Sequence, residues 1–212
     1  MIELRLACFD GSSRGKVLAR LAEHQPHDVS RSHTGQPQLL LKSGQQLGFS
    51  IAHVRKGTRP ISIMAVALGF QIGIDAENWP LGKADPAFLA SVASDEDTAI
   101  LAKLSKIKYD LARFLWVVKE AALKASGDVM VDPRELAVRL SYSGNISVSS
   151  TRNASAPFEE IGVRILQLRP SEGDETILLA IATHAKGEMN GVFSEAQWKL
   201  QPFPHHPKGD EV

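Results

Sequence analysis

Apolar and polar residues alternate near the start of the chain, in the pattern of a β-strand with one buried face. Residues 2–8 read Ile-Glu-Leu-Arg-Leu-Ala-Cys, and a period of two residues predicts a half-buried strand. Runs of apolar and β-branched residues between turn residues predict the other strands. These lie at Gln38–Leu41, Leu47–Val54, Ile61–Leu68, Gln71–Asp75, Leu136–Leu140, Ile146–Ser149, Val163–Leu168, Ile177–Thr183 and Gln197–Leu200.

Three segments have apolar residues at helical spacing. The first runs from Ser13 to about His24 behind a serine cap. In the second, Ser94 is followed three residues later by Asp97, which resembles a capping box at the start of a helix. The longest helix is predicted from about Asp110 to Ser126 and ends at Gly127, a typical residue after a helix C-terminus.

The order of these elements predicts an α+β protein. A succession of strand, helix and strands occurs before about Gln71 and again after it, so we expect two halves of related layout with the site between them. The halves span residues 1–71 and 72–201. Polar residues with Gly and Pro predict a loop at Pro26–Gln38, and Pro, His and charge predict a mobile tail at 202–212.

Composition and charge exclude several classes of protein. The 212 residues are 43% hydrophobic and 23% charged, as in soluble globular proteins. Because 24 basic residues balance 24 acidic ones, we expect no nucleic-acid partner. The longest apolar stretch, Ile61–Phe70, is too short to span a membrane, and the single Cys8 excludes an internal disulfide. The charged opening residues 1–5 are not typical of a secretory signal, so we expect a cytoplasmic protein.

Two carboxylates end an apolar strand. Asp75 and Glu77 are two residues apart, so they point to the same face if the strand continues. A hard divalent cation would relieve their repulsion, and Mg²⁺ prefers one or two carboxylates together with phosphate oxygens. A solvated strand end with two exposed acids is the alternative interpretation.

The long helix and a strand end carry further candidate residues. Glu120 and Lys124 are four residues apart, which suits either an exposed ion pair or an acid and an ammonium group in a shared site. His53 ends a strand just before Arg55 and Lys56. These three side chains either bind a phosphate group or are a strand-end histidine followed by an ordinary basic turn.

Together, these segments resemble the paired signature of the 4'-phosphopantetheinyl transferases. Ile-Gly-Ile-Asp-Ala-Glu at 72–77 resembles the (V/I)G(I/V)D element, and Trp-Val-Val-Lys-Glu-Ala-Ala-Leu-Lys at 116–124 resembles the (F/W)xxKE(A/S)xxK element. Residues 49–53 resemble the segment F-N-x-S-H, and residues 35–37 resemble the turn G-K-P. The chain length is similar to that of the Sfp type, which is a pseudo-dimer of two similar α/β halves with the active site at their interface.

The resemblance implies a Mg²⁺-dependent transferase. It would move the 4'-phosphopantetheine arm of coenzyme A to a serine of an apo acyl or peptidyl carrier protein and release 3',5'-ADP. Such holo-acyl-carrier-protein synthase activity serves fatty acid, polyketide or nonribosomal peptide biosynthesis, and we expect a monomer. The alternative is a catalytically weak homologue that binds coenzyme A or a carrier protein.

The resemblance also assigns the metal and catalytic roles. Asp75 and Glu120 would bind Mg²⁺, with Glu77 as a third ligand directly or through water. Glu120, or a water that it holds, would accept the proton of the carrier serine. Lys124 would stabilise the phosphate or the departing nucleotide.

Contacts with coenzyme A are assigned more broadly. His53 would contact a phosphate, and Lys119 belongs to the helix motif, although it points about 100° away from Glu120. Charge and region alone favour four further residues for phosphate binding: Arg14, Lys16, Arg55 and Lys56. Three positions depart from the family pattern and predict altered coenzyme A binding: Gln36, Ser50 and Ala52.

Overall fold

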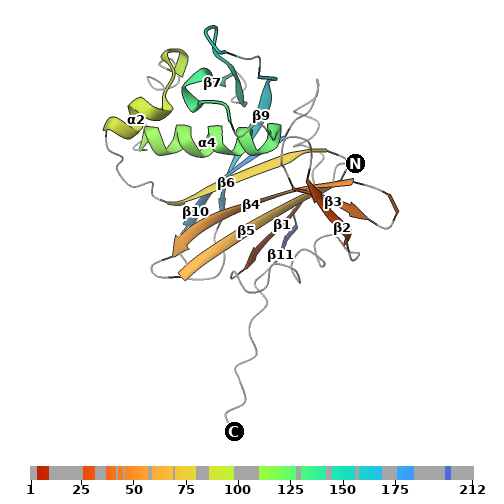
Figure 1. Ribbon diagram of the computed structural model, residues 1–212. Coiled ribbons are helices and arrows are strands. Elements are labelled where there is room, and N and C mark those ends of the chain that lie inside the picture. Colours follow the sequence, from red (N-terminus) through yellow and green to blue (C-terminus); the bar gives the residue numbers. More distant parts are fainter. Residues whose placement is uncertain are drawn as a thin grey trace.

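Two β-sheets pack face to face, and the longest helix covers the other face of the second sheet (Figure 1). The predicted α+β class is confirmed. The computed structural model describes residues 4–9, 26–31, 37–41, 43–44, 46–56, 59–68, 70–79, 86–97, 110–127, 130–141, 145–155, 158–168, 176–183 and 199–201.

The first sheet has six strands in the order β11-β1-β5-β4-β3-β2. Neighbouring strands are antiparallel except β1 and β11, which are parallel. Because β11 comes from the end of the chain, this sheet combines both ends of the sequence. Its strands are β1 (Leu4–Phe9), β2 (Pro26–Arg31), β3 (Pro37–Leu41), β4 (Gln46–Lys56), β5 (Arg59–Leu68) and β11 (Lys199–Gln201).

The second sheet has five antiparallel strands in the order β6-β10-β9-β8-β7. All of them come from the chain after residue 71. They are β6 (Ile72–Trp79), β7 (Leu136–Leu140), β8 (Ile146–Ser150), β9 (Ile161–Leu168) and β10 (Thr176–Thr183). The division into two halves at residue 71 and the pseudo-dimer remain predictions.

The long helix α4 (Leu111–Ser126) is the predicted one, and it ends at Gly127 as expected. The Asp110 carboxylate accepts a hydrogen bond from the Arg113 N–H, and Gly127, at φ 75°, closes the helix. Among the described residues, three short helices accompany it: α2 (Pro86–Val92), η2 (Asp95–Asp97) and η3 (Pro133–Glu135). No helix in the described part of the chain has the length and apolar character to cross a bilayer.

Strand β6 separates the two main cores. Its residues Ile72, Ile74 and Ala76, together with residues of β10, pack against β4 and β5 of the first sheet. Because side chains alternate along a strand, the intervening residues face α4 on the opposite side. These are Gly73, Asp75 and Glu77.

The prediction of a loop at Pro26–Gln38 is wrong, because Pro26–Arg31 forms strand β2. Of the strands that the structure describes, β3 alone pairs with β2, which lies at the edge of its sheet. Edge strands tolerate polar residues and proline, since one side makes no ladder hydrogen bonds. Two other predictions, the helix from Ser13 and the tail at 202–212, lie outside the described residues.

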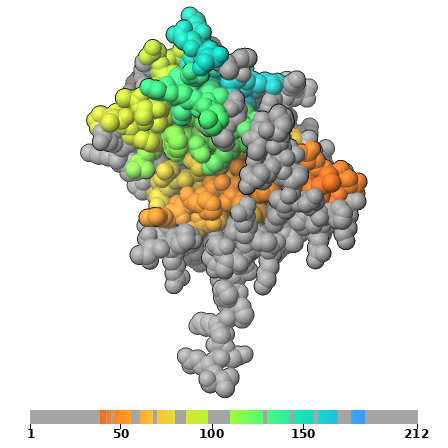
Figure 2. Space-filling view, viewed as in Figure 1, coloured from red at the N-terminus to blue at the C-terminus, as the bar shows by residue number. Residues whose placement is uncertain are grey.

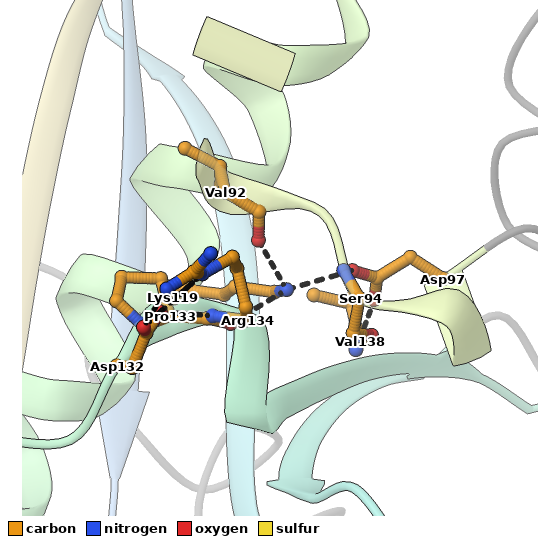
Figure 3. Close-up of polar contacts among 8 residues, drawn as sticks. All are labelled: Val92, Ser94, Asp97, Lys119, Asp132, Pro133, Arg134 and Val138. Carbon is orange, nitrogen blue, oxygen red and sulfur yellow. Dashed lines mark hydrogen bonds and ion pairs between the residues drawn. The ribbon is translucent and has the colours of Figure 1, made fainter. Parts of the chain in front are cut away.

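A buried ion pair ties α4 to the segments that cover it (Figure 3). The Lys119 ammonium is fully buried and donates to the carbonyls of Val92 (2.8 Å) and Pro133 (3.0 Å) and to Asp97 Oδ2 (2.7 Å). Asp97 also accepts from the N–H groups of Ser94 and Val138, both at 2.7 Å. Burial lowers the pKa of Lys119 from its ordinary value of 10.5, and Asp97 opposes that shift.

This arrangement explains the capping pattern at Ser94. The Asp97 carboxylate accepts from the Ser94 N–H, as in a capping box, within the short helix η2. The helix expected to continue from there falls on residues outside the described part of the chain. Asp97 therefore serves two purposes: it closes a turn and neutralises a buried lysine.

Replacing Lys119 with methionine is expected to lower the free energy of unfolding by about 3–5 kcal/mol, because Asp97 would be left as an unpaired buried charge. Urea denaturation followed by circular dichroism measures the change. Adding Asp97→Asn should recover part of the loss. Arg139→Met, which breaks an exposed pair with Glu96, is the control and should cost less than about 1 kcal/mol. An equally small effect at Lys119 would contradict the structural role.

Candidate active site

Helix α4 is buried on most of its surface, and its partly exposed residues lie mainly along one line. Arg113, Glu120 and Lys124 are spaced by seven and four residues, so they lie within about 20° of one direction around the helix axis. Trp116 is also partly exposed and contacts Phe88 of α2, with ring centroids 5.9 Å apart. Figure 2 shows α4 in green next to β6 in yellow and β4 in orange on one face of the molecule.

Gly73 brings this line of side chains against β6. A Cβ atom at Gly73 would lie 2.0 Å from the Ala121 carbonyl oxygen and 2.3 Å from the Ala125 nitrogen. These are backbone atoms of α4, so the helix lies directly on the strand. The Ile-Gly-Ile-Asp segment therefore needs a glycine at this position, because any side chain would collide with the helix backbone.

The close contact between α4 and β6 brings two predicted acids and the predicted lysine together. Lys124 Nζ lies 2.8 Å from Asp75 Oδ1 and 3.5 Å from Glu120 Oε1. The pair on the helix has the i,i+4 spacing of an ordinary surface ion pair. Its contact with Asp75, 49 residues away in the sequence, makes it part of a tertiary site.

Asp75 is the least exposed of the three carboxyl groups at this site. Burial raises its pKa from 3.8 to about 6, and the nearby carboxylates of Glu120 and Glu77 act in the same direction. The Lys124 ammonium opposes the shift. A buried acid held next to other acids is typical of functional sites, because a compact fold alone does not require it.

Glu77 lies farther along β6 and has its own basic partner. Arg113 Nη1 lies 3.6 Å from Glu77 Oε1. The expectation that Asp75 and Glu77 share one face of the strand is met, because β6 continues to Trp79. The contact with Arg113 was not predicted, although its spacing to Glu120 and Lys124 places all three on one side of a helix.

The acids suit a hard divalent cation. Asp75 and Glu120 each have an oxygen within 3.5 Å of Lys124 Nζ, so the positively charged ammonium group of Lys124 lies between the two carboxylates. Within the described residues, no three His, Cys, Asp or Glu side chains form a metal-binding group. The arrangement fits Mg²⁺ bound by one or two carboxylates, with other ligands from water or phosphate.

His53 lies on a different face from these acids. Its Nδ1 lies 2.9 Å from the Ser62 hydroxyl, whereas the neighbouring Ala52 and Val54 pack into the core between the sheets. The side chain of His53 therefore points away from β6. The structure does not bring it into contact with Asp75.

The neighbouring Ser50 has a structural role. Its hydroxyl accepts a hydrogen bond from the Ile74 N–H at 3.0 Å and links β4 to β6. Ala52, the other departure in this segment, is buried. Both residues serve the contact between the two sheets.

The other predicted coenzyme A contacts are spread over the chain. Arg55 is exposed, and its carbonyl accepts a hydrogen bond from Asn78 at 2.6 Å. Lys119 is fully buried, with its ammonium bound to protein acceptors, which argues against the predicted role in cofactor binding. Arg14, Lys16 and the side chain of Lys56 lie outside the described residues.

A comparison with protein families gives a match in the part of the chain that carries the candidate site. Residues 71–174, just under half of the chain, match the family model of the 4'-phosphopantetheinyl transferase superfamily. This segment contains β6, α4 and the five charged residues of the candidate site: Asp75, Glu77, Arg113, Glu120 and Lys124. A search of curated proteins gave no match.

Gly73→Ala is expected to lower the free energy of unfolding by about 3 kcal/mol or more, because the new methyl group would push against the α4 backbone. Urea denaturation measures the change. Gly44→Ala is the control: its methyl group meets no atom within 4 Å, and the positive φ of 80° costs only about 1 kcal/mol. Equal effects at the two glycines would show that the helix does not rest on Gly73.

The raised pKa of Asp75 predicts a stability that depends on pH. The native state holds this proton more tightly than the unfolded state, so the resulting stabilisation is complete below about pH 4 and is lost as the pH rises through 6. Asn at position 75 does not titrate, so the Asp75→Asn variant does not lose this stabilisation. The free energy of unfolding of the variant, minus that of the native protein, should therefore rise by about 2–3 kcal/mol between pH 4 and pH 8. Urea denaturation across this range, with a chelator present, measures the difference, and a constant difference would contradict the assignment.

Proposed function

We propose that this protein is an Sfp-type 4'-phosphopantetheinyl transferase. It moves the 4'-phosphopantetheine arm of coenzyme A onto a serine of an apo acyl or peptidyl carrier protein. The match of residues 71–174 supports phosphopantetheine transfer in general. The chain length of 212 residues supports the Sfp type, in which one polypeptide carries both halves of the fold.

One observation carries the proposal. Asp75 and Glu120, which are 45 residues apart in sequence, meet at the ammonium group of Lys124 inside the matched segment. A chance pair of surface acids would not need the close contact that Gly73 allows between β6 and α4. The three residues form a compact site with both negative and positive charge.

The acids would hold Mg²⁺ in this site. Asp75 and Glu120 are the direct ligands in our proposal, and Glu77 acts directly or through a water molecule. A bound Mg²⁺ supplies charge neutralisation for the diphosphate of coenzyme A. Phosphate oxygens would complete the ligand set.

The protein side chains then have separate tasks in the transfer. Glu120, directly or through a held water, accepts the hydroxyl proton of the carrier serine. The serine oxygen forms a bond to the phosphorus that bears the pantetheine arm, and the bond from that phosphorus to the bridging oxygen breaks. 3',5'-ADP leaves with the bonding electrons, and Lys124 balances the charge on its phosphate.

Binding of the nucleotide end of coenzyme A involves residues farther from the acids. His53, Arg55 and Lys56 remain our candidates on β4, and Arg14 and Lys16 remain candidates from the chain before it. The reaction would take place in the cytoplasm, with the protein as a monomer. Lys119 is left out of this set, because its ammonium is buried against Asp97.

Purified protein incubated with Mg²⁺, coenzyme A and a panel of apo carrier proteins should add the mass of one phosphopantetheine arm to a carrier. Intact-mass spectrometry measures this addition. Asp75→Asn and Glu120→Gln should each lower the rate by about 100-fold or more, because the negative charges that hold the metal are lost. Circular dichroism checks that both variants fold.

Glu159→Gln, which changes an exposed glutamate outside the site, is the matched control and should retain the native rate. Full activity in both site variants would reject the assignment of the acids. Binding of coenzyme A without transfer to any carrier would favour the alternative of a weak homologue that only binds. Failure to bind coenzyme A would reject both functions.

A further inference from the structure

The site contains more basic charge than the assigned roles explain. Three carboxylates, those of Asp75, Glu77 and Glu120, are accompanied by two cations. Lys124 lies between Asp75 and Glu120, and Arg113 lies beside Glu77. Each end of the acidic group thus has its own positive partner, and only Lys124 has a task in the proposed transfer.

Arg113 makes little use of its hydrogen-bonding capacity in this position. Its Nε atom is buried and has no hydrogen-bond partner among the described residues. Its Nη1 atom is 3.6 Å from Glu77, which is an ion-pair distance and too long for a hydrogen bond. Since a guanidinium group has five N–H donors, a partner that accepts two of them would bind it better than Glu77 does.

The location of Arg113 favours a phosphate as that partner. The residue lies on the same side of α4 as Glu120, about 10 Å away along the axis. Its side chain is 38% exposed, and that of Glu77 is 32% exposed, so both can reach a ligand from solvent. Bidentate contact with phosphate is a typical use of arginine.

We propose that Arg113 is a phosphate-binding residue that makes metal and diphosphate binding cooperative. Without ligands, it balances the charge of Glu77. When Glu77 turns to a metal ion, directly or through water, the guanidinium group turns to a phosphate oxygen of the co-substrate. The metal ion at Glu77 and the identity of the diphosphate as coenzyme A rest on the proposed function, whereas the capacity of Arg113 for a better partner rests on its geometry.

Isothermal titration calorimetry without a carrier protein tests this exchange. The probes are Mg²⁺ alone, inorganic pyrophosphate and coenzyme A, each diphosphate with and without Mg²⁺. In the native protein, Mg²⁺ should tighten the binding of both diphosphates by about 5-fold or more. In Arg113→Met, this factor should fall to near one, while Mg²⁺ alone binds as well as before or better, because Glu77 has lost its competing cation.

Three further variants sharpen the test. Arg113→Lys keeps the charge but lacks the planar donor group, so it should restore the coupling only in part. Arg113→Gln removes the charge with a polar side chain and provides the same comparison if Arg113→Met is unstable. Arg139→Met removes an exposed arginine that is paired with Glu96 and should leave every binding constant unchanged.

The outcomes separate the inference from the proposed function. Undiminished coupling in Arg113→Met and Arg113→Gln would overturn the inference. The inference would also be overturned if Arg113→Met weakened the binding of Mg²⁺ alone as much as it weakened the coupling. Arg113 would then only position the acidic side chains. Coupled binding of pyrophosphate without any binding of coenzyme A would support the role of Arg113 and reject the proposed function. Binding of neither diphosphate to the native protein would reject both.

Discussion

The direct contact of the α4 backbone with Gly73 of β6 is the constraint on which the candidate site depends. Side chains normally hold a helix and a sheet apart, and here one position has none. The contact determines how far Asp75 and Glu77 lie from the side chains of the helix. The ion pairs to Lys124 and Arg113 both require this distance, because their partners come from distant parts of the chain.

The opposite side of α4 is held by a different kind of interaction. Lys119 and Glu120 are adjacent in sequence, yet Lys119 is completely buried against Asp97, while Glu120 is partly exposed and contacts Lys124 in the candidate site. Apolar replacement of a buried ion pair is often neutral for stability, so such a pair is poorly explained by stability alone. We infer that it determines the rotation of the helix, because the acceptors that the described residues offer to the ammonium come from α2, η2 and η3, all on that side.

Charge balance links stability to the proposed chemistry. Three acids around one strand and one helix destabilise each other, and burial raises the pKa of Asp75 even with Lys124 beside it. Such an arrangement costs stability and is typical of a site that is completed by a ligand of opposite charge. The two basic residues reduce the cost in the free protein. In the proposed function, they would also bind the phosphates of the substrate once a metal ion takes their place.

The sequence by itself determined most of the strands, the long helix and the residues of the acidic group. Periodicity predicted most strands, and the caps Asp110 and Gly127 marked the ends of α4, because these signals depend on neighbouring residues. Only the tertiary structure decided that Pro26–Arg31 pairs as an edge strand, that Lys119 is buried and that His53 faces away from Asp75. It also decided that Arg113 meets Glu77. These outcomes depend on which distant surfaces pack together, and no local pattern of residues contains that information.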